Sequence, residues 1–505
     1  MKSFIRGTFI LMLAIFLSKL LGFVFRIQFI RIAGEEAVGI YMTAYPAFIF
    51  FLSLVQLGIP VAIAKIIAAL EAKQQYEKIQ SVMKSAAILT IFTAIAFIPA
   101  ALLFIPYLAG TLLENEFAVY TLYTSVIIIP IAAIGGLIRG YFQGIAKIEE
   151  TAWSQLIEQT LRIAFITWML PLFYVENSPA LNAAFAMGIT LLAEVASVCY
   201  LLFKYRQYHK RQKTQKRQQE RYPFEPILAI ALPASGSKLF GTFTWFLEPI
   251  IFLRALTVSG LSAVQATTLY GIISGVFIPL LLFPSFIPYA LAVVLIPAVS
   301  SAIAANHVKK LQTRIQLALR LSALTGTFAA VIFFLHGQLF AEKLFKVADD
   351  GQYMKLLAPV FFFYYIQSPL YAILQAIGEA KAGMLNSIYG GIAKLGVMFI
   401  LASQPGLQET GAVLAIGFGV LVTSFLHIAT LRKHPMAGSG FSMFITPYLA
   451  FILAVVIRPI FLPMYNHLWS DTLITIGFLA VLLLVLNQIR YSDWKYLKKV
   501  IQSQR

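Results

Sequence analysis

The chain has 505 residues, of which 60% are hydrophobic and 12% are charged, and its formal net charge is +18. Soluble domains contain about 25% charged residues, so this composition excludes an ordinary soluble protein and indicates an integral membrane protein. The single cysteine, Cys199, excludes a disulfide framework, and the six histidines are scattered without ligand spacing. We therefore predict neither a metal site nor a bound cofactor.

Fourteen apolar segments are long enough to cross a bilayer, which takes about 20 residues each. In chain order they cover residues 5–32, 38–70, 82–108, 117–146, 152–175, 181–204, 226–256, 264–303, 313–336, 354–378, 384–403, 409–431, 441–462 and 470–489. The eighth segment contains four prolines and exceeds one span, which predicts a broken or tilted helix. The expected fold class is an all-α polytopic membrane protein with 14 transmembrane helices.

The placement of Lys and Arg supports this count, because cytoplasmic loops hold the excess of these residues. Both termini and the loops after even-numbered helices are rich in them. The loops after odd-numbered helices hold only Arg254, Lys343, Lys346 and Lys355. The alternation predicts that both termini are cytoplasmic.

Short repeated motifs relate the two halves of the chain. SKLLG at 18–22 reappears as SKLFG at 237–241, and the YFQGIAK motif around Gln143 resembles the ILQAIGEAK motif around Gln375. Their preserved order favours a parallel repeat of six helices plus six. We expect an N-terminal six-helix lobe over 1–205, a basic cytoplasmic linker over 206–225, a C-terminal six-helix lobe over 226–433, and two extra helices with a cytoplasmic tail over 434–505.

The linker carries much of the positive charge. The tract 204–221 contains eight Lys or Arg residues. A solvated segment beside anionic lipid headgroups explains this charge, and no aromatic stacking platform accompanies it. The sequence therefore predicts membrane lipid as a neighbour and no nucleic acid as a partner.

The stretch SKLLGFVFRIQFIR places three cations in the first apolar segment. Each cation at the centre of a bilayer costs about 2.5–3.5 kcal/mol on insertion scales, so it is either hidden at the interface or used. Lys19 and Arg26 are seven residues apart and project from nearly the same face of a helix, which favours a wet cavity. Arg31 lies about one turn from the outer end and can reach the surface.

Other segments carry isolated charges as well. Lys238 is the repeat counterpart of Lys19, and Glu248 lies further along the same segment. Glu158 and Arg162 have the i, i+4 spacing of an ion pair, which leaves open a structural pair or a role in substrate binding or gating. The repeat partner of Arg162 is Lys394, which has no such neighbour in its own segment.

The remaining charged residues of the apolar segments give weaker signals. Glu194 is a lone acid, open to protonation, pairing or ion coupling. Arg139, Arg320 and Arg458 lie where reaching the interface is the default expectation. We expect all four aspartates to lie outside the membrane-crossing helices, including Asp471 at the very start of the last apolar segment.

Charge inside the predicted bundle is thus mainly basic, which suits an anion such as a phosphate or pyrophosphate. An exporter of cationic drugs would instead use buried carboxylates as its principal groups. No Walker loop, dinucleotide fingerprint, HExxH or GxSxG motif is present, so we do not expect an enzyme.

The stretch SKLLGFVFRIQFIRIAGEEAVGIYMTAYPAF, followed by GIPVAIAKIIA and RGYFQGIAKIEETAWSQLIEQTLRI, resembles the stage V sporulation protein B group of polysaccharide-biosynthesis transporters. That group belongs to the multidrug, oligosaccharidyl-lipid and polysaccharide exporter superfamily, with the lipid II flippases. The resemblance implies two six-helix lobes around a cationic cavity, a lipid groove on two extra helices, and a place in the bacterial plasma membrane.

Two departures from the group's pattern stand out. The group's basic positions in helix one match Lys19 and Arg31, but its "RD" pair is replaced by Phe25 and Arg26. Flippases of the group also place cations inside helices two and eight, whereas here helix two has only Lys65 at its end and helix eight has none.

The leading hypothesis is a flippase that moves an undecaprenyl-pyrophosphate-linked cell-wall precursor, lipid II above all, to the outer leaflet by alternating access, with a role in sporulation. The predicted substrate-binding residues are Lys19, Arg26, Arg31, Lys238, Arg162, Lys394, Gln143 and Gln375. The predicted gating or ion-coupling residues are Glu158, Glu194 and Glu248. We expect a working monomer, with cell-wall synthesis proteins as candidate partners. The alternatives are a cation-coupled multidrug antiporter, a membrane-embedded transferase, and a noncatalytic scaffold of the cell-wall machinery.

Overall fold

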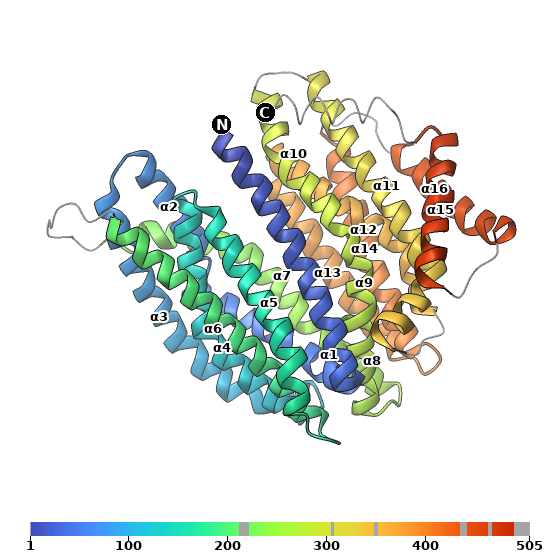
Figure 1. The fold of residues 1–505 in the computed structure, drawn as a ribbon, viewed down its shortest axis with the longest axis horizontal. Helices are drawn as coiled ribbons and strands as arrows, with labels where there is room; N and C mark the ends of the chain where they lie inside the picture. The colour runs from blue at the N-terminus through green and yellow to red at the C-terminus, as the bar shows by residue number, and fades with distance from the viewer. Residues whose placement is uncertain are drawn as a thin grey trace. The chain divides into compact units, whose positions relative to one another are not determined.

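A computed structural model describes residues 2–211, 222–304, 308–347, 352–434, 442–462 and 467–488, and every regular element in these ranges is helical (Figure 1). The α-helices are α1 (Lys2–Gln56), α2 (Ile59–Ala72), α3 (Tyr76–Tyr107), α4 (Ala118–Gly144), α5 (Ile148–Leu172), α6 (Pro179–Arg211), α7 (Glu225–Val258), α8 (Ala263–Ile272), α9 (Ile278–Leu282), α10 (Phe286–Ala304), α11 (Val308–Phe340), α12 (Gln352–Ala376), α13 (Ala380–Ala402), α14 (Gln408–Arg432), α15 (Ser442–Phe461) and α16 (Leu468–Val485). Three π-helical turns, Leu108–Leu112, Ile273–Phe277 and Ala341–Phe345, and one 3₁₀ turn, Phe283–Ser285, extend or join them.

Twelve helical segments of the described ranges are long and apolar enough to cross a membrane. The segment Phe16–Gln56 covers residues 16–32 of the first predicted span and 38–56 of the second, with a break at Gly34 between them. Helix α5 matches the fifth predicted span in length, but its polar residues keep it out of the twelve. The all-α polytopic fold is confirmed, and each predicted span has a helical counterpart.

Two glycines mark breaks in the helices, one just before the second predicted span and one inside it. Gly34 interrupts α1 with φ +81°, a left-handed conformation that costs glycine little. Leu57 and Gly58 have φ +41° and +69° and separate α1 from α2, after which Pro60 begins the new helix. The second span is therefore two helices joined at a rigid turn.

The eighth predicted span is broken, as its prolines indicated. It consists of α8, the π turn Ile273–Phe277, α9, the 3₁₀ turn Phe283–Ser285 and α10. Proline lacks the backbone N–H that continues an α-helix, and Pro279 and Pro284 lie at the start of α9 and of the 3₁₀ turn. Backbone groups freed in this way need other partners.

The chain folds into two compact units. The first contains residues 3–257 and 261–275, and the second contains 258–260 and 276–505. In the first unit, α4 packs against α2, α3 and α6, and α5 packs against α6 (Figure 1). Close approach is possible because a Cβ on Gly140 would lie 2.6 Å from the carbonyl oxygen of Pro60.

The second unit is built around α11 and α12. Helix α12 packs against α10, α11 and α14, and α11 also contacts α15 and α16. Its core includes Phe362 and Ile366 of α12 with Phe451 and Ala454 of α15 and Leu479 of α16. The two extra helices expected from the sequence thus belong to this unit.

The predicted linker and tail lie largely outside the described residues. Helix α6 continues to Arg211, residues 212–221 are not described, and the chain is described again from Tyr222. The C-terminal residues 489–505 are likewise outside the described ranges. The division at 205, 225 and 433 stays a prediction.

Candidate functional site

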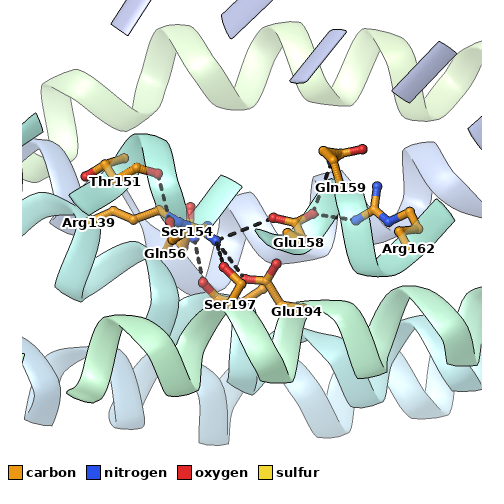
Figure 2. Close-up of polar contacts among 10 residues, drawn as sticks. Gln56, Arg139, Thr151, Ser154, Glu158, Gln159, Arg162, Glu194 and Ser197 are labelled. Carbon is orange, nitrogen blue, oxygen red and sulfur yellow. Dashed lines mark hydrogen bonds and ion pairs between the residues drawn. The ribbon is translucent and has the colours of Figure 1, made fainter. Parts of the chain in front are cut away.

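Four charged residues from three helices of the first unit form one network (Figure 2). Nη2 of Arg139, on α4, lies 3.2 Å from Oε1 of Glu194 on α6 and 3.6 Å from Oε2 of Glu158 on α5. The other oxygen of Glu158 lies 2.5 Å from Nη2 of Arg162, one helical turn away. The ion pair expected from the i, i+4 spacing is present, and Arg139 extends it to Glu194.

Small residues make room for this network. A Cβ on Gly135 would lie 3.1 Å from Oε1 of Glu194, tighter than most real contacts, so a larger residue here would press on the carboxylate. Ser197 follows Glu194 by one turn, and its Oγ accepts a hydrogen bond of 3.1 Å from Nη2 of Arg139. Helices α4 and α6 therefore meet through a glycine, a serine and an ion pair.

The network balances two guanidinium groups against two carboxylates in a partly buried place. Glu194 is 6% exposed, and the other three side chains are partly buried. Within the described residues, Nε of Arg139 and Nε of Arg162 have no hydrogen-bond partner although they are buried. An unmade hydrogen bond of this kind costs about 1–3 kcal/mol, which the ion pairs of the same guanidinium groups offset.

The first helix contributes an aromatic surface beside Arg162. The guanidinium carbon of Arg162 lies 5.8 Å from the ring centroid of Phe25, within cation–π range. Phe25 is buried and its ring neighbours are Phe29 and Tyr41. An arginine from α5 thus lies over the ring of Phe25, the position where the family resemblance leads us to expect a cation.

Arg26 lies in a different environment from its neighbour. Its side chain is partly buried, and Nη1 donates a hydrogen bond of 2.9 Å to the carbonyl oxygen of Ser274. Ser274 belongs to the π-helical turn of the broken eighth span, where regular α-helical bonding is interrupted. Arg26 therefore satisfies a backbone acceptor and keeps its full charge.

Lys19 and Arg31 are both exposed on the same helix. Exposure of Arg31 agrees with its predicted reach to the interface. Lys19 is exposed whereas Arg26 is partly buried, so the two side chains differ in environment. Their roles stay predictions.

Lys238 lies beside the break between α1 and α2. Its Nζ donates a hydrogen bond of 3.2 Å to Oε1 of Gln56, the last residue of α1, while its side chain stays exposed. The amide of Gln56 is neutral, so this contact does not balance a charge on the ammonium group. The sequence analysis did not identify Gln56, although it is a polar residue at the end of an apolar run.

Four further predicted residues lie on α4, α7, α12 and α13. Gln143 and Gln375 are exposed near the C-terminal ends of α4 and α12, Glu248 is partly buried in α7, and Lys394 is partly buried in α13. A Cβ on Gly419 would lie 2.7 Å from Cβ of Lys394, so α13 and α14 pack closely there. Gln143 and Glu248 belong to the first unit and Gln375 and Lys394 to the second, and the roles predicted for these four stay predictions.

Two expectations about arginines near span ends are wrong. Arg139 does not extend to the interface, because two carboxylates and a serine hold it inside the first unit. Arg458 is 0% exposed and forms an ion pair with Asp471, which lies in the first turn of α16. Asp471 therefore belongs to a spanning segment, contrary to expectation, and its side chain is also 0% exposed.

A histidine completes this second cluster, which lies in the second unit. Nδ1 of His336 is 3.4 Å from Oδ2 of Asp471, and its Nε2 is 2.8 Å from Oγ1 of Thr475. These residues come from α11, α15 and α16, so the cluster links the two extra helices to α11 within the second unit. Arg458 and Asp471 are 13 residues apart and lie on different helices, so their pairing has no helical spacing by which the sequence could reveal it.

Comparison with known proteins places these features in a family. Residues 4–303 match the family described as polysaccharide biosynthesis protein. The chain is 36% identical over 440 residues to stage V sporulation protein B of Bacillus subtilis (strain 168), covering 86% of this chain and 84% of that protein. It is 23% identical over 473 residues to lipid II flippase MurJ of the same organism, covering 86% of this chain and 83% of the flippase.

Solved structures share the fold at low sequence identity. Lipid II flippase MurJ in an inward closed conformation aligns over 96% of this chain and 99% of its own length, with a TM-score of 0.69 and 16% identity. An inward-facing multidrug resistance transporter of the MATE family aligns over 83% of this chain and 96% of its own length, with a TM-score of 0.64 and 16% identity. These likenesses establish the architecture.

Proposed function

The chain belongs to the polysaccharide biosynthesis protein family, and we propose that it flips an undecaprenyl-pyrophosphate-linked cell-wall precursor, of the lipid II type, to the outer leaflet. It is a multi-pass membrane transporter of the multidrug, oligosaccharidyl-lipid and polysaccharide exporter superfamily, with similarity to stage V sporulation protein B. A role in sporulation follows from that similarity and is part of the proposal.

One observation carries the choice of an anionic substrate. Glu158 and Glu194 are both engaged by arginines, whereas Arg26 and Lys238 donate to neutral acceptors, a backbone carbonyl and an amide. Charges of this kind remain available to a pyrophosphate, which offers several oxygens as acceptors. A cation-coupled drug antiporter would use free carboxylates instead, and here the two acids are already paired.

In the proposed mechanism, the headgroup phosphates meet Arg26, Lys238 and Lys19 of the first unit, with Arg162 reached along the path. Outward movement of an anion is favoured by an inside-negative membrane potential, by about 2.3 kcal/mol per charge per 100 mV. This direction requires that the termini are cytoplasmic, which is also part of the proposal.

The polyprenyl tail would stay in lipid along the two extra helices. Helices α15 and α16 have large apolar side chains that are exposed, including Val456, Ile460, Leu473 and Val481. Such side chains are suited to contact with lipid, because the hydrocarbon chains of lipid are as apolar as the side chains themselves. The headgroup and the tail thus use different parts of the protein.

Reconstituted liposomes test the proposal. We expect purified protein to move a fluorescent lipid II analogue between leaflets, and Arg26→Gln and Lys238→Gln to slow this at least about tenfold, a loss of about 1.4 kcal/mol of stabilisation. Lys84→Gln removes an exposed cation of α3 and should transport at the wild-type rate. Uptake of cationic dyes without movement of the lipid would favour the antiporter.

A further inference from the structure

The break between α1 and α2 holds a buried amide at its centre. Gln56 is the last residue of α1 and is 9% exposed, although it lies between Val55 and Leu57 in an apolar run. Burial of a polar side chain there is favourable only when both ends of the amide are bonded. The arrangement around Gln56 meets that condition.

The two ends of the amide have different partners. Nε2 donates to the carbonyl oxygen of Ala132 in α4 at 3.4 Å, and Oε1 accepts from Nζ of Lys238 in α7 at 3.2 Å. A carbonyl can only accept and an ammonium can only donate, so these partners fix which end of the amide faces Lys238. The acceptor oxygen is directed at the lysine.

Backbone packing keeps the amide in this place. A Cβ on Gly136 would lie 2.6 Å from Nε2 of Gln56, so only glycine leaves room for the amide against α4. Oγ1 of Thr93 donates a hydrogen bond of 2.6 Å to the carbonyl oxygen of Val55. This bond satisfies a backbone acceptor that the break in the helix leaves without its helical partner. The side chain of Gln56 is therefore held by α4 and bonds α7, while α3 holds the backbone of the preceding residue, Val55.

An exposed lysine gains most from such a fixed acceptor. The Lys238 side chain has many rotamers, and part of this freedom is lost when the ammonium binds a ligand. A hydrogen bond to a fixed neutral oxygen restricts the ammonium before the ligand arrives, so less conformational entropy is lost on binding. A carboxylate in the same place would also neutralise the positive charge, which the amide does not. We infer that Gln56 is a positioning residue that holds the Lys238 ammonium ready for an anionic headgroup.

This inference rests on the proposed function, and a double-mutant cycle tests it in liposomes with the lipid II analogue. Gln56→Met should raise the half-saturating substrate concentration about tenfold and leave the maximal rate within about twofold. In a Lys238→Gln background, Gln56→Met should change nothing further, because the two residues act as one unit. Additive losses in the double variant would overturn the inference.

Two variants separate positioning from structure. Thr93→Val removes the hydrogen bond to Val55 at the same break and leaves the Gln56–Lys238 contact in place, so the half-saturating concentration should not move. Gln56→Glu keeps the shape but neutralises the ammonium, so affinity should fall further than in Gln56→Met. An equal shift in Thr93→Val and Gln56→Met would mean a structural role and contradict the inference.

A second readout does not depend on transport. Acetylation of Lys238, followed by mass spectrometry, should be at least twofold faster in Gln56→Met than in the wild type, with Lys84 as the internal reference. If the wild type moves no lipid, the proposed function fails, while this labelling still decides whether Gln56 holds Lys238. Unchanged labelling would overturn the inference whatever the transport result.

Discussion

The two arginine–carboxylate clusters of this protein differ in burial and in what they join. Arg458, Asp471 and His336 are all 0% exposed, whereas the side chains of Arg139 and Arg162 are 20% and 11% exposed. In the described residues both clusters retain an arginine Nε that is buried without a hydrogen-bond partner, so exposure is what separates them. A fully buried ion pair is suited to a fixed structural role, because its groups cannot reach another partner. A partly exposed arginine is suited to exchanging one partner for another. Charge alone therefore does not mark a working site.

Removing one member of the fully buried cluster should have the largest effect on stability. Arg458→Ala leaves the Asp471 carboxylate buried without its charged partner, so the free energy of unfolding should fall by about 3–5 kcal/mol. Thermal unfolding of purified protein in detergent measures this. Replacing both by apolar residues, as in Arg458→Met with Asp471→Leu, should recover most of the loss, and failure to recover would argue against a purely structural anchor.

Glu158→Gln tests the partly exposed cluster. Glu158 is shared by two arginines, and we expect its loss to lower the free energy of unfolding by about 1–3 kcal/mol, less than Arg458→Ala. Flipping should fall at least tenfold, since Arg139 and Arg162 lose their orientation. A stability loss as large as that of Arg458→Ala, with flipping unchanged, would remove the distinction between the clusters.

Ser197→Ala removes a single neutral acceptor from Arg139. The hydroxyl accepts one hydrogen bond, so we expect a loss of about 0.5–1.5 kcal/mol in unfolding free energy with flipping near the wild-type rate. Chemical denaturation gives the first value and the liposome assay the second. A tenfold loss of flipping would show that the serine has a role beyond packing.

The exposed ion pair between Arg254 and Glu114 gives the smallest expected effect. The arginine side chain is 58% exposed, and exposed pairs contribute about 0–1 kcal/mol. Arg254→Ala should therefore leave both stability and flipping near wild type, and it serves as the baseline for the other variants. A loss above about 2 kcal/mol would mean that exposure is a poor guide in this protein.

Much of the fold was predictable because apolar length determines which segments enter a bilayer. The spans, the broken eighth segment and the Glu158–Arg162 pair follow from length, proline and i, i+4 spacing, all of which are local. The pairing of Arg139 with Glu194 could not be predicted from the sequence, because it depends on how α4 and α6 pack around Gly135.

The burial of Arg458 escaped sequence reasoning for a similar reason. An arginine near the end of a span is ordinarily expected at the interface, and only the fold shows that Asp471 and His336 lie beside it. Gln56 carried one usable signal, a polar residue just before the Gly-Ile-Pro motif that begins α2. Its partners, Ala132 and Lys238, lie far away in sequence and could not be inferred.

Movement of a pyrophosphate-linked lipid by purified protein tests the central claim most directly. Wild-type protein in liposomes should flip a fluorescent lipid II analogue faster than empty liposomes, and inorganic pyrophosphate on the headgroup side should compete with it. Lys238→Gln should lose both the flipping and the competition, while Lys84→Gln keeps both. Flipping by Lys238→Gln at the wild-type rate, or none by the wild type, would contradict the account.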